Sequence, residues 1–337
     1  MSQPVFCDTV QSLNDAVQSL SGCHLLFVDC EGVNLGNLDG TLSIITLNTP
    51  PSHGPSGSET YLVDVTRLSP TQLGPLFDIL ASHHITKVVW DGRMDYSALH
   101  HEYTVDMHNI LDLQVVDILS RGMREETTEE HLKRFRGYAL PKLLKGVKSR
   151  QRYTGLHKLS GLLQAIREHQ PDDHEQFSKV KVDHSIWGSE RPLPAEYIQY
   201  AAMDVHMISA LYYTFVSRGY TTGHDDVALK AKCARYVAFW AERQPRVDER
   251  NFYVRNAFLP LELIDDPLPP HLPRRECGKC GRSLTDASYS PAQWAKQVTP
   301  TRACLLCEEV MKNFRHWNAR ENYMARRAAA SQEKASL

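Results

Sequence analysis

Short apolar runs punctuate the first third of the chain and are separated by polar loops or amphipathic stretches. Five runs have the length of buried strands, at 24–29, 42–47, 61–65, 86–90 and 109–113. An amphipathic stretch follows Ser69-Pro70 as far as position 82, and another runs from 91 to 101, which predicts two helices. Strands joined by short connections, followed by strands that alternate with helices, predict a mixed sheet with antiparallel strands on one side and parallel strands on the other.

The sequence pattern of the rest of the chain changes twice, first to a helical pattern and then to a Pro-rich one. Residues 114–217 read as mostly helical, with prolines marking breaks, and 226–244 reads as another helix. The Pro-rich segment at 263–273 reads as a stiff, extended linker. We therefore expect five parts: a large α/β domain at 1–222, a helical extension at 223–262, the linker, a small unit at 274–327 and a disordered tail at 328–337.

Composition places the chain among ordinary globular proteins. It has 337 residues, of which 42% are hydrophobic and 23% charged, enough for a large core and a smaller second unit. The first part of the chain lacks the pattern of a secretory signal, and no apolar run approaches the ~20 residues of a membrane span. We therefore expect a cytoplasmic or nuclear protein with no membrane partner, in which cysteines are to be read for metal binding before disulfides.

Charge is unevenly distributed, although the net charge is only −2. From His271 to the end, 12 Lys and Arg stand against 6 Asp and Glu, so the last part of the chain is basic. A second basic tract runs from His131 to Arg152 and holds no acidic residue. Such a tract is either a solvated helix face or a surface for phosphate groups.

Acidic residues stand where the predicted elements would bring them together. Asp29 and Glu31 end a predicted strand two residues apart, so both point to the same face and can hold a cation. Asp95 falls in the first turn of the helix after a parallel strand, and the carboxyl ends of such strands collect ligands. Tyr200 and Asp204 lie one turn apart on an apolar helix, where a buried Asp is costly unless it is paired or bound to metal. Each feature alone is weak, because such an Asp can also reach solvent.

The order of these residues resembles the three motifs of the DEDD superfamily of 3′-5′ exonucleases, in the subclass with a tyrosine in its third motif. Trp187, Arg191-Pro192-Leu193 and Tyr200-Ala-Ala-Met-Asp204-Val205 are similar to the corresponding stretch of ribonuclease D. The second motif, Trp-Asp-Gly-Arg-Met-Asp at 90–95, departs from ribonuclease D and looks closer to the exonuclease-domain branch that includes Egalitarian. The resemblance covers residues 20–217 and implies an α/β fold, a ribonuclease H-like mixed sheet flanked by helices, so that 1–222 would be the exonuclease domain.

The resemblance also implies a chemistry. Members of the family hydrolyse the phosphodiester bond at the 3′ end of a nucleic acid with two Mg²⁺ or Mn²⁺ ions, hard cations that suit carboxylates. Here Asp29 would bridge both ions, Glu31 and Asp204 would complete the first, and Asp95 would hold the second. Tyr200 would position the attacking water, because a phenol with an ordinary pKa of ~10 is a poor base at neutral pH. The expected partner is a single-stranded 3′ end, of RNA rather than DNA.

Phosphate contacts are expected from basic residues near these motifs. Arg93 can meet a phosphate or form a surface salt bridge, and both interpretations stay open. The family places helices beside its substrate channel in the region of the basic tract, whose candidates for contact with nucleic acid are Lys142, Lys145, Lys148, Arg150 and Arg152. Trp187 is expected in the core rather than as a stacking platform for a base.

Two CxxC pairs follow the linker. Cys277 and Cys280 form the first, Cys304 and Cys307 the second, and 23 residues separate the pairs. Four thiolates at this spacing can close a tetrahedral Zn²⁺ site. A redox CxxC is the alternative, but it needs only one pair and a strand-helix unit around it. We therefore expect a zinc-ribbon-like unit in which one structural Zn²⁺ supplies much of the stability.

Three functions compete on this evidence. The first is an active exonuclease whose zinc unit assists in binding substrate or a protein partner. The second is a catalytically silent nucleic-acid-binding or scaffold protein that keeps the exonuclease fold, and the third is a protein whose working part is the cysteine unit. Silent relatives typically lack one or more of the acidic residues, and the complete set here favours the first. A basic stretch with interleaved aromatic residues, 308–327, can either stack on bases or pack on the zinc unit.

Overall fold

The structure is a computed structural model that describes residues 3–51, 57–136, 153–170, 174–177, 182–188, 191–223, 226–246, 256–265, 272–309 and 311–312. The chain forms two compact units. One comprises Met1–Arg124 and Ser160–Glu249, and the other comprises Glu125–Leu159 and Arg250–Leu337. Residues 125–159 thus group with the cysteine-containing part of the chain rather than with their immediate neighbours in sequence.

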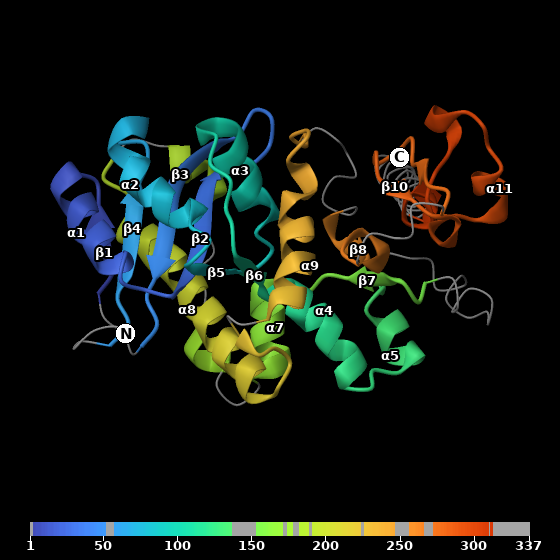
Figure 1. The fold of residues 1–337 in the computed structure, drawn as a ribbon, viewed down its shortest axis with the longest axis horizontal. Coiled ribbons are helices and arrows are strands. Elements are labelled where there is room, and N and C mark those ends of the chain that lie inside the picture. The colour runs from blue at the N-terminus through green and yellow to red at the C-terminus, as the bar shows by residue number, and fades with distance from the viewer. Residues whose placement is uncertain are drawn as a thin grey trace, which may run out of the picture. The chain divides into compact units, whose positions relative to one another are not determined.

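A six-stranded sheet forms the centre of the first unit (Figure 1). The strands lie in the order β1-β4-β3-β2-β5-β6, with bounds Val5–Cys7 for β1, Leu25–Val33 for β2, Thr41–Asn48 for β3, Thr60–Asp64 for β4, Thr86–Val89 for β5 and Ile110–Asp112 for β6. Strands β2, β3 and β4 are antiparallel neighbours, whereas β5 and β6 run parallel to β2. The predicted mixed sheet is confirmed. Strand β1 adds a parallel edge next to β4, and its three residues are too short for a periodic pattern to reveal.

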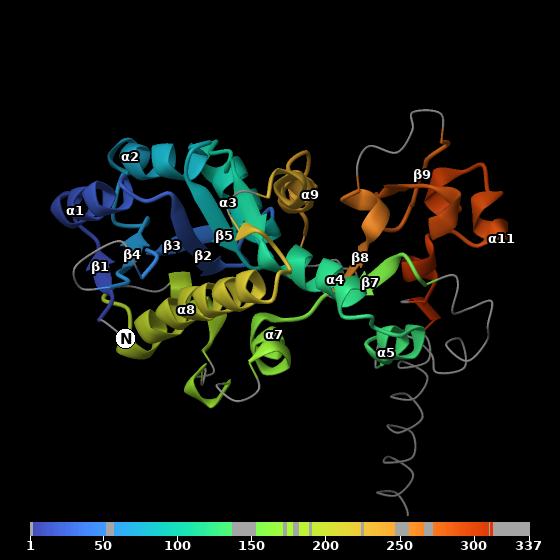
Figure 2. The same ribbon diagram turned by 60° about the horizontal axis from the view of Figure 1, so that its bottom comes forward.

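Helices cover both faces of this sheet. Their bounds are Val10–Leu20 for α1, Pro70–Ala81 for α2, Arg93–Tyr103 for α3, Leu113–Met123 for α4, Leu162–His169 for α7, Ala195–Ser217 for α8 and Val227–Val237 for α9, with 3-10 turns at His174–Phe177 (η1), His184–Gly188 (η2) and Ala238–Trp240 (η4). Figure 2 shows α1, α2 and α3 on one side of the sheet and α8 on the other. Strands β2 and β3 are therefore buried along most of their length, which is why they appear in the sequence as apolar runs.

Particular hydrogen bonds mark the start of α2 and the chain just beyond the end of α9. Helix α2 begins where the Ser69 side chain accepts a hydrogen bond from the backbone N–H of Gln72 and the Gln72 side chain accepts one from the backbone N–H of Ser69. Helix α9, which the sequence predicts to reach position 244, ends instead at Val237. Beyond it the Trp240 carbonyl lies 2.9 Å from Nε2 of His101, a contact outside the helical pattern. None of the helices that the structure describes is long and apolar enough to cross a membrane.

The second unit consists of short elements. Their bounds are Thr128–Lys133 for α5, Leu156–Lys158 for β7, Phe258–Pro260 for β8, Leu261–Leu263 for η5, Arg275–Glu276 for β9, Ser283–Leu284 for β10, Asp286–Ser288 for η6, Pro291–Trp294 for α11 and Thr299–Thr301 for η7. Strand β7 pairs antiparallel with β8, and β9 pairs with β10. The prediction that 114–217 is mostly helical is wrong at β7, because Leu156 pairs with Pro260, a partner too far along the chain for a local pattern to signal.

One apolar core joins the two segments of the second unit. It packs Phe135 and Tyr153 from the first segment against Phe258 and Leu284 from the second, together with three of the four cysteines of the CxxC pairs. The rings of Phe135 and Phe258 lie 5.1 Å apart between centroids. The cysteine segment therefore shares its core with Leu132, Phe135, Tyr153 and Leu156, which gives it more buried surface than its own length provides.

Candidate functional site

Three carboxylates meet between the central strand of the sheet and the helix that covers it. Asp29 and Glu31 stand on β2 and Asp204 stands on α8, and their ligand oxygens all lie within 4.8 Å of one another. Alternate residues of a strand face the same side, which explains why both β2 carboxylates reach Asp204. Glu31 and Asp204 are each 6% exposed, so their negative charges are held close together and largely out of water. The structure thus brings together three of the predicted site residues.

The fourth predicted carboxylate, Asp95, approaches from the neighbouring strand. Strand β5 runs parallel to β2, and α3 begins just beyond its carboxyl end with Asp95 in the first turn. Burial raises the pKa of the Asp95 carboxyl well above its ordinary value, and the charges of Asp29, Asp91, Asp112 and Asp204 raise that pKa further, in that order. Buried carboxylates that raise one another's pKa favour a bound cation, whose charge offsets their repulsion.

Tyr200 lies one helical turn before Asp204 on α8 and is half-buried. The centroid of its ring is 6.3 Å from that of Trp187 and 6.1 Å from that of His184. Trp187 is fully buried, as predicted, and forms part of the core under α8. Tyr200 thus neighbours these two rings, one helical turn from Asp204. His184 carries no sequence signal, because a single histidine in a 3-10 turn follows no recognisable pattern.

A buried ion pair anchors the loop before α8. The Arg191 guanidinium contacts the carboxylate of Asp64 at the end of β4, through Nε to Oδ2 and through Nη2 to Oδ1 at 3.2 Å. Its Nη1 also donates to the carbonyl of Trp187 at 3.3 Å. Asp64 is completely buried. Sequence reasoning noticed Arg191 only as part of a family motif and missed Asp64, because the two residues are far apart in the chain.

Arg93 is buried and forms a salt bridge with Asp91, whose side chain is 32% exposed. Its Nε and Nη2 donate to the two carboxylate oxygens of Asp91 at 2.6 and 2.9 Å, and the residue is 5% exposed. Burial alone would lower the pKa of the guanidinium, but the adjacent Asp91 outweighs that effect and raises it. The other candidates for contact with nucleic acid lie outside the described residues: Lys142, Lys145, Lys148, Arg150 and Arg152.

A second group of ligand-type side chains is already neutralised by its neighbours. Asp117, Glu168 and His169 come close enough together to hold a cation. However, the Asp117 carboxylate is 2.8 Å from Nη2 of Arg121 and 2.9 Å from Nε2 of His169. Burial tends to raise the pKa of Asp117, but the hydrogen bond from His169 and the charge of Arg121 lower it overall. The group is best explained as a buried ion-pair cluster of the core.

The four cysteines of the CxxC pairs converge in the second unit. Their sulfur atoms all lie within 4.8 Å of one another, and the backbone N–H of Cys304 donates to Sγ of Cys277 at 3.2 Å. Gly281 adopts a φ of +71° and its N–H donates to the Cys277 carbonyl at 2.8 Å, which closes the first turn. Hydrogen bonds from the other three thiols lower the pKa of Cys277. A compact set of four sulfurs with one thiolate favoured fits the tetrahedral ligand set of a structural Zn²⁺.

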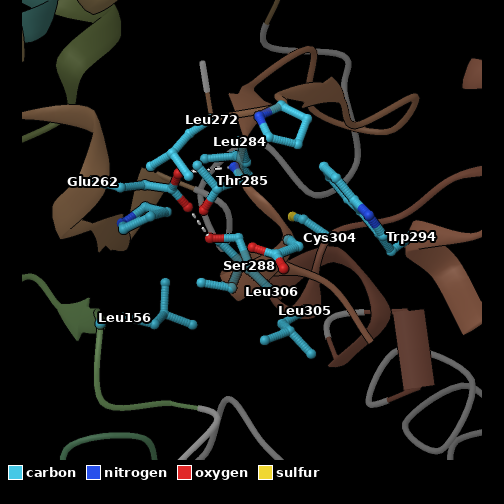
Figure 3. A pocket seen from close by; sticks show the side chains of 15 residues that line it. Leu156, Glu262, Leu272, Leu284, Thr285, Ser288, Trp294, Cys304, Leu305 and Leu306 are labelled. Atoms are coloured by element: carbon cyan, nitrogen blue, oxygen red, sulfur yellow. Dashed lines mark hydrogen bonds between the residues drawn. The ribbon is translucent and has the colours of Figure 1, made fainter. Parts of the chain in front are cut away.

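A pocket of about 620 Å³ opens in the second unit (Figure 3). Its walls are largely apolar, and the Glu262 carboxylate inside it accepts hydrogen bonds from the Thr285 backbone N–H and the Ser288 hydroxyl. Of the described residues that line it, the charged ones, Glu262 and Asp286, are both acidic. A phosphate backbone does not fit such a lining, so this pocket is no candidate for the nucleic-acid site.

The fold and the carboxylate site agree with a known family. A family model described as 3′-5′ exonuclease matches residues 4–218, well over half of the chain, and the chain belongs to that family. The matched region contains all four carboxylates and Tyr200. The predicted resemblance to the DEDD superfamily is therefore confirmed.

The fold is similar to that of solved ribonuclease D structures. The GMP complex of Trypanosoma brucei RNase D is 21% identical over 84% of this chain and 83% of that chain, with a TM-score of 0.53. The complex of the same enzyme with RNA U12 is 21% identical over 83% and 82%, with a TM-score of 0.51. A further structure of this enzyme is 22% identical over 73% and 75%, with a TM-score of 0.50. At these identities the likeness shows the fold alone. No curated protein matches the sequence significantly.

Proposed function

We propose that this protein is a metal-dependent exonuclease that shortens single-stranded RNA from its 3′ end. The observation that carries the proposal is the convergence of Asp29, Glu31 and Asp204 from β2 and α8. Asp95 on α3 lies near enough for the charges of Asp29 and Asp204 to raise its pKa, so three separate segments supply these carboxylates in the order typical of the family. RNA is proposed as the substrate because the similar RNase D of Trypanosoma brucei has been solved with RNA U12 and with GMP.

The carboxylates fit two divalent cations. Asp29, Glu31 and Asp204 would hold the first, and Asp29 with Asp95 would hold the second. A set of oxygen ligands suits Mg²⁺ or Mn²⁺. When bound, these cations supply charge that stabilises the attacking and leaving oxygens of phosphodiester hydrolysis. The raised pKa of Asp95 supports this assignment, since its ionised form would be stabilised by a neighbouring cation.

Tyr200 would orient the attacking water. Its ring neighbours those of Trp187 and His184, and the residue lies one turn from Asp204. A hydroxyl in this position can accept or donate a hydrogen bond to water without changing its own charge. We assign it positioning rather than proton transfer, because a phenol is a poor base at neutral pH.

The cysteine unit would hold one structural Zn²⁺ through Cys277, Cys280, Cys304 and Cys307. The close approach of the four sulfurs supports this proposal, and the shared core with Phe135 and Phe258 gives the metal a structural role in the whole second unit. In an exonuclease such a unit would assist by contacting the substrate or a protein partner.

The test of the proposed function uses RNA and DNA labelled at either end. Purified protein is incubated with single strands labelled at the 5′ or the 3′ end, in Mg²⁺, Mn²⁺ or chelator. We expect 5′-labelled RNA to shorten stepwise and the 3′ label to be released at once, only with metal. Asp29→Ala should abolish shortening, whereas Asp78→Ala, which removes an exposed carboxylate on α2, should not. Binding without shortening of any substrate would instead identify a silent nucleic-acid-binding protein.

A further inference from the structure

The turn that leads into α3 is held by the neighbouring strand. Asp91 adopts a φ of +55°, a left-handed conformation that Asp tolerates better than most residues. The backbone N–H groups of Asp91 and Gly92 donate to the carboxylate of Asp112, at 3.2 and 2.9 Å. Asp112 ends β6 and is completely buried. The backbone of the turn is therefore hydrogen-bonded to the end of β6, and the Asp91 side chain takes no part in these two bonds.

The half-buried Asp91 side chain instead contacts two buried side chains, those of Arg93 and Tyr236. Both oxygens of Asp91 accept hydrogen bonds from Arg93, and the Tyr236 hydroxyl lies 3.1 Å from Oδ1 of Asp91. The Arg93 guanidinium stands 4.8 Å from the centre of the Tyr236 ring, within the range of a cation–π contact. Tyr236 is 1% exposed, and its hydroxyl also lies 2.5 Å from Oε1 of Gln114 on α4. Three helices thus meet at one phenol.

The cluster controls the orientation of the first turn of α3. A helix turns by about 100° per residue, so Arg93 and Asp95 project from nearly opposite sides of that turn. Holding Arg93 against α9 therefore sets the rotation that directs Asp95 toward Asp29. Helix α9 begins at Val227, whereas the family match ends at residue 218. The contact thus comes from a part of the chain that the family model does not include.

We propose that Tyr236 is a positioning residue for the exonuclease site: through Asp91 and Arg93 it holds α3 so that Asp95 can ligate the second cation. The inference rests on the proposed function. It also makes Arg93 a buried residue that connects Asp91 with Tyr236, rather than a phosphate contact. Replacing a residue that hydrogen-bonds directly to a metal ligand lowers metal affinity by about 10- to 100-fold. A smaller loss is expected for a residue, such as Tyr236, that acts on the ligand through other residues.

The test compares Tyr236→Phe with Tyr96→Phe in the full chain. Tyr96 lies on α3, the helix that carries Asp95, and is 9% exposed. Its replacement by Phe removes a comparable hydrogen bond, to Asp106 at 3.0 Å. Mn²⁺ binding is measured by calorimetry without substrate, and we expect Tyr236→Phe to weaken it about 3- to 10-fold, with no change in Tyr96→Phe. Hydrogen exchange should accelerate in the first turn of α3, where the Tyr96 amide donates to the Gly92 carbonyl at 2.9 Å. In the RNA assay kcat should fall while KM stays constant.

Several outcomes would overturn the inference. Unchanged Mn²⁺ affinity in Tyr236→Phe would do so, as would a wild-type protein that binds no Mn²⁺. Arg93→Lys keeps the positive charge but loses the bidentate contact with Asp91. It should therefore bind Mn²⁺ as weakly as Tyr236→Phe. A raised KM for RNA with unchanged Mn²⁺ affinity would instead make Arg93 a phosphate contact and contradict the proposal. If wild-type protein binds Mn²⁺ but shortens no substrate, the proposed function fails, and the binding comparison still decides the role of Tyr236.

Discussion

Replacing Arg191 by Met should destabilise the first unit strongly, because it leaves a carboxylate buried without its cation. Asp64 is completely buried and contacts Arg191 through two nitrogens of the guanidinium. After the substitution the carboxylate keeps two hydrogen bonds, from the backbone N–H of Thr66 at 3.1 Å and from the Thr66 hydroxyl at 2.6 Å. The loop before α8 also loses the bond from Arg191 to the Trp187 carbonyl.

The size of the effect follows from this geometry. Removing one partner of a buried ion pair costs about 3–5 kcal/mol in the free energy of unfolding. The Arg191 side chain is 10% exposed and Thr66 still satisfies one carboxylate oxygen, which places the expected loss at the lower end, about 3 kcal/mol. For a unit of this size each kcal/mol shifts the melting temperature by about 2–4 °C, so we expect a fall of about 6–12 °C.

Thermal unfolding followed by circular dichroism at neutral pH measures this loss. Arg67→Met is the matched control, because Arg67 is exposed on the segment after β4, and it should stay within about 0.5 kcal/mol of wild type. Adding Asp64→Asn to Arg191→Met should recover part of the stability, since the buried charge is then gone. A fall of less than about 2 °C in Arg191→Met would refute the reasoning.

Three further predictions concern acid stability, zinc and the tyrosine. The pKa of Asp117 is lowered in the folded protein, so its carboxylate stabilises the fold above the ordinary carboxyl pKa of about 4, and this stabilisation is lost as the pH falls. The difference between wild type and Asp117→Asn in the free energy of unfolding in urea should therefore shrink toward pH 3. A constant difference would contradict this. Elemental analysis should find about one Zn per chain, and Cys277→Ser should lose it. Cys23→Ser, which replaces a buried free thiol of the first unit, should keep it. Equal zinc content in the two variants would exclude the site. Tyr200→Phe keeps the ring packing and should lower kcat for RNA by about 10-fold or more at constant KM; an unchanged kcat would rule out a role for its hydroxyl.

Local pattern was enough to single out the four carboxylates as candidates, and the structure brings three of them, Asp29, Glu31 and Asp204, together. Asp29 and Glu31 end a recognisable apolar strand, and their spacing alone places them on one face. Asp95 follows a parallel strand into a helix, and such positions gather at one edge of a sheet. Asp204 stands out because a buried helix rarely carries a carboxylate without a partner or a metal. These are short-range rules, and the mixed sheet followed from them as well.

Short-range rules could not predict the contacts between distant residues that support the site. Asp64 and Arg191 are brought together by the sheet and the loop before α8, and neither residue has a local feature that names its partner. Tyr236 reaches Asp91 from a segment that the sequence predicts only as another helix. The salt bridge of Arg93 was foreseen as one alternative, but its burial depends on α9 packing over it. Pairings between distant segments are decided by tertiary packing, which a single sequence does not display.

The central claim is that Asp29, Glu31, Asp95 and Asp204 form one divalent-cation site in an exonuclease. Crystals of the protein soaked in Mn²⁺ and measured at the manganese absorption edge test this claim most directly. We expect an anomalous peak among Asp29, Glu31 and Asp204 and a second peak beside Asp95, both missing in Asp29→Ala. A wild-type map without a peak among these carboxylates, under conditions in which the protein shortens RNA, would contradict it.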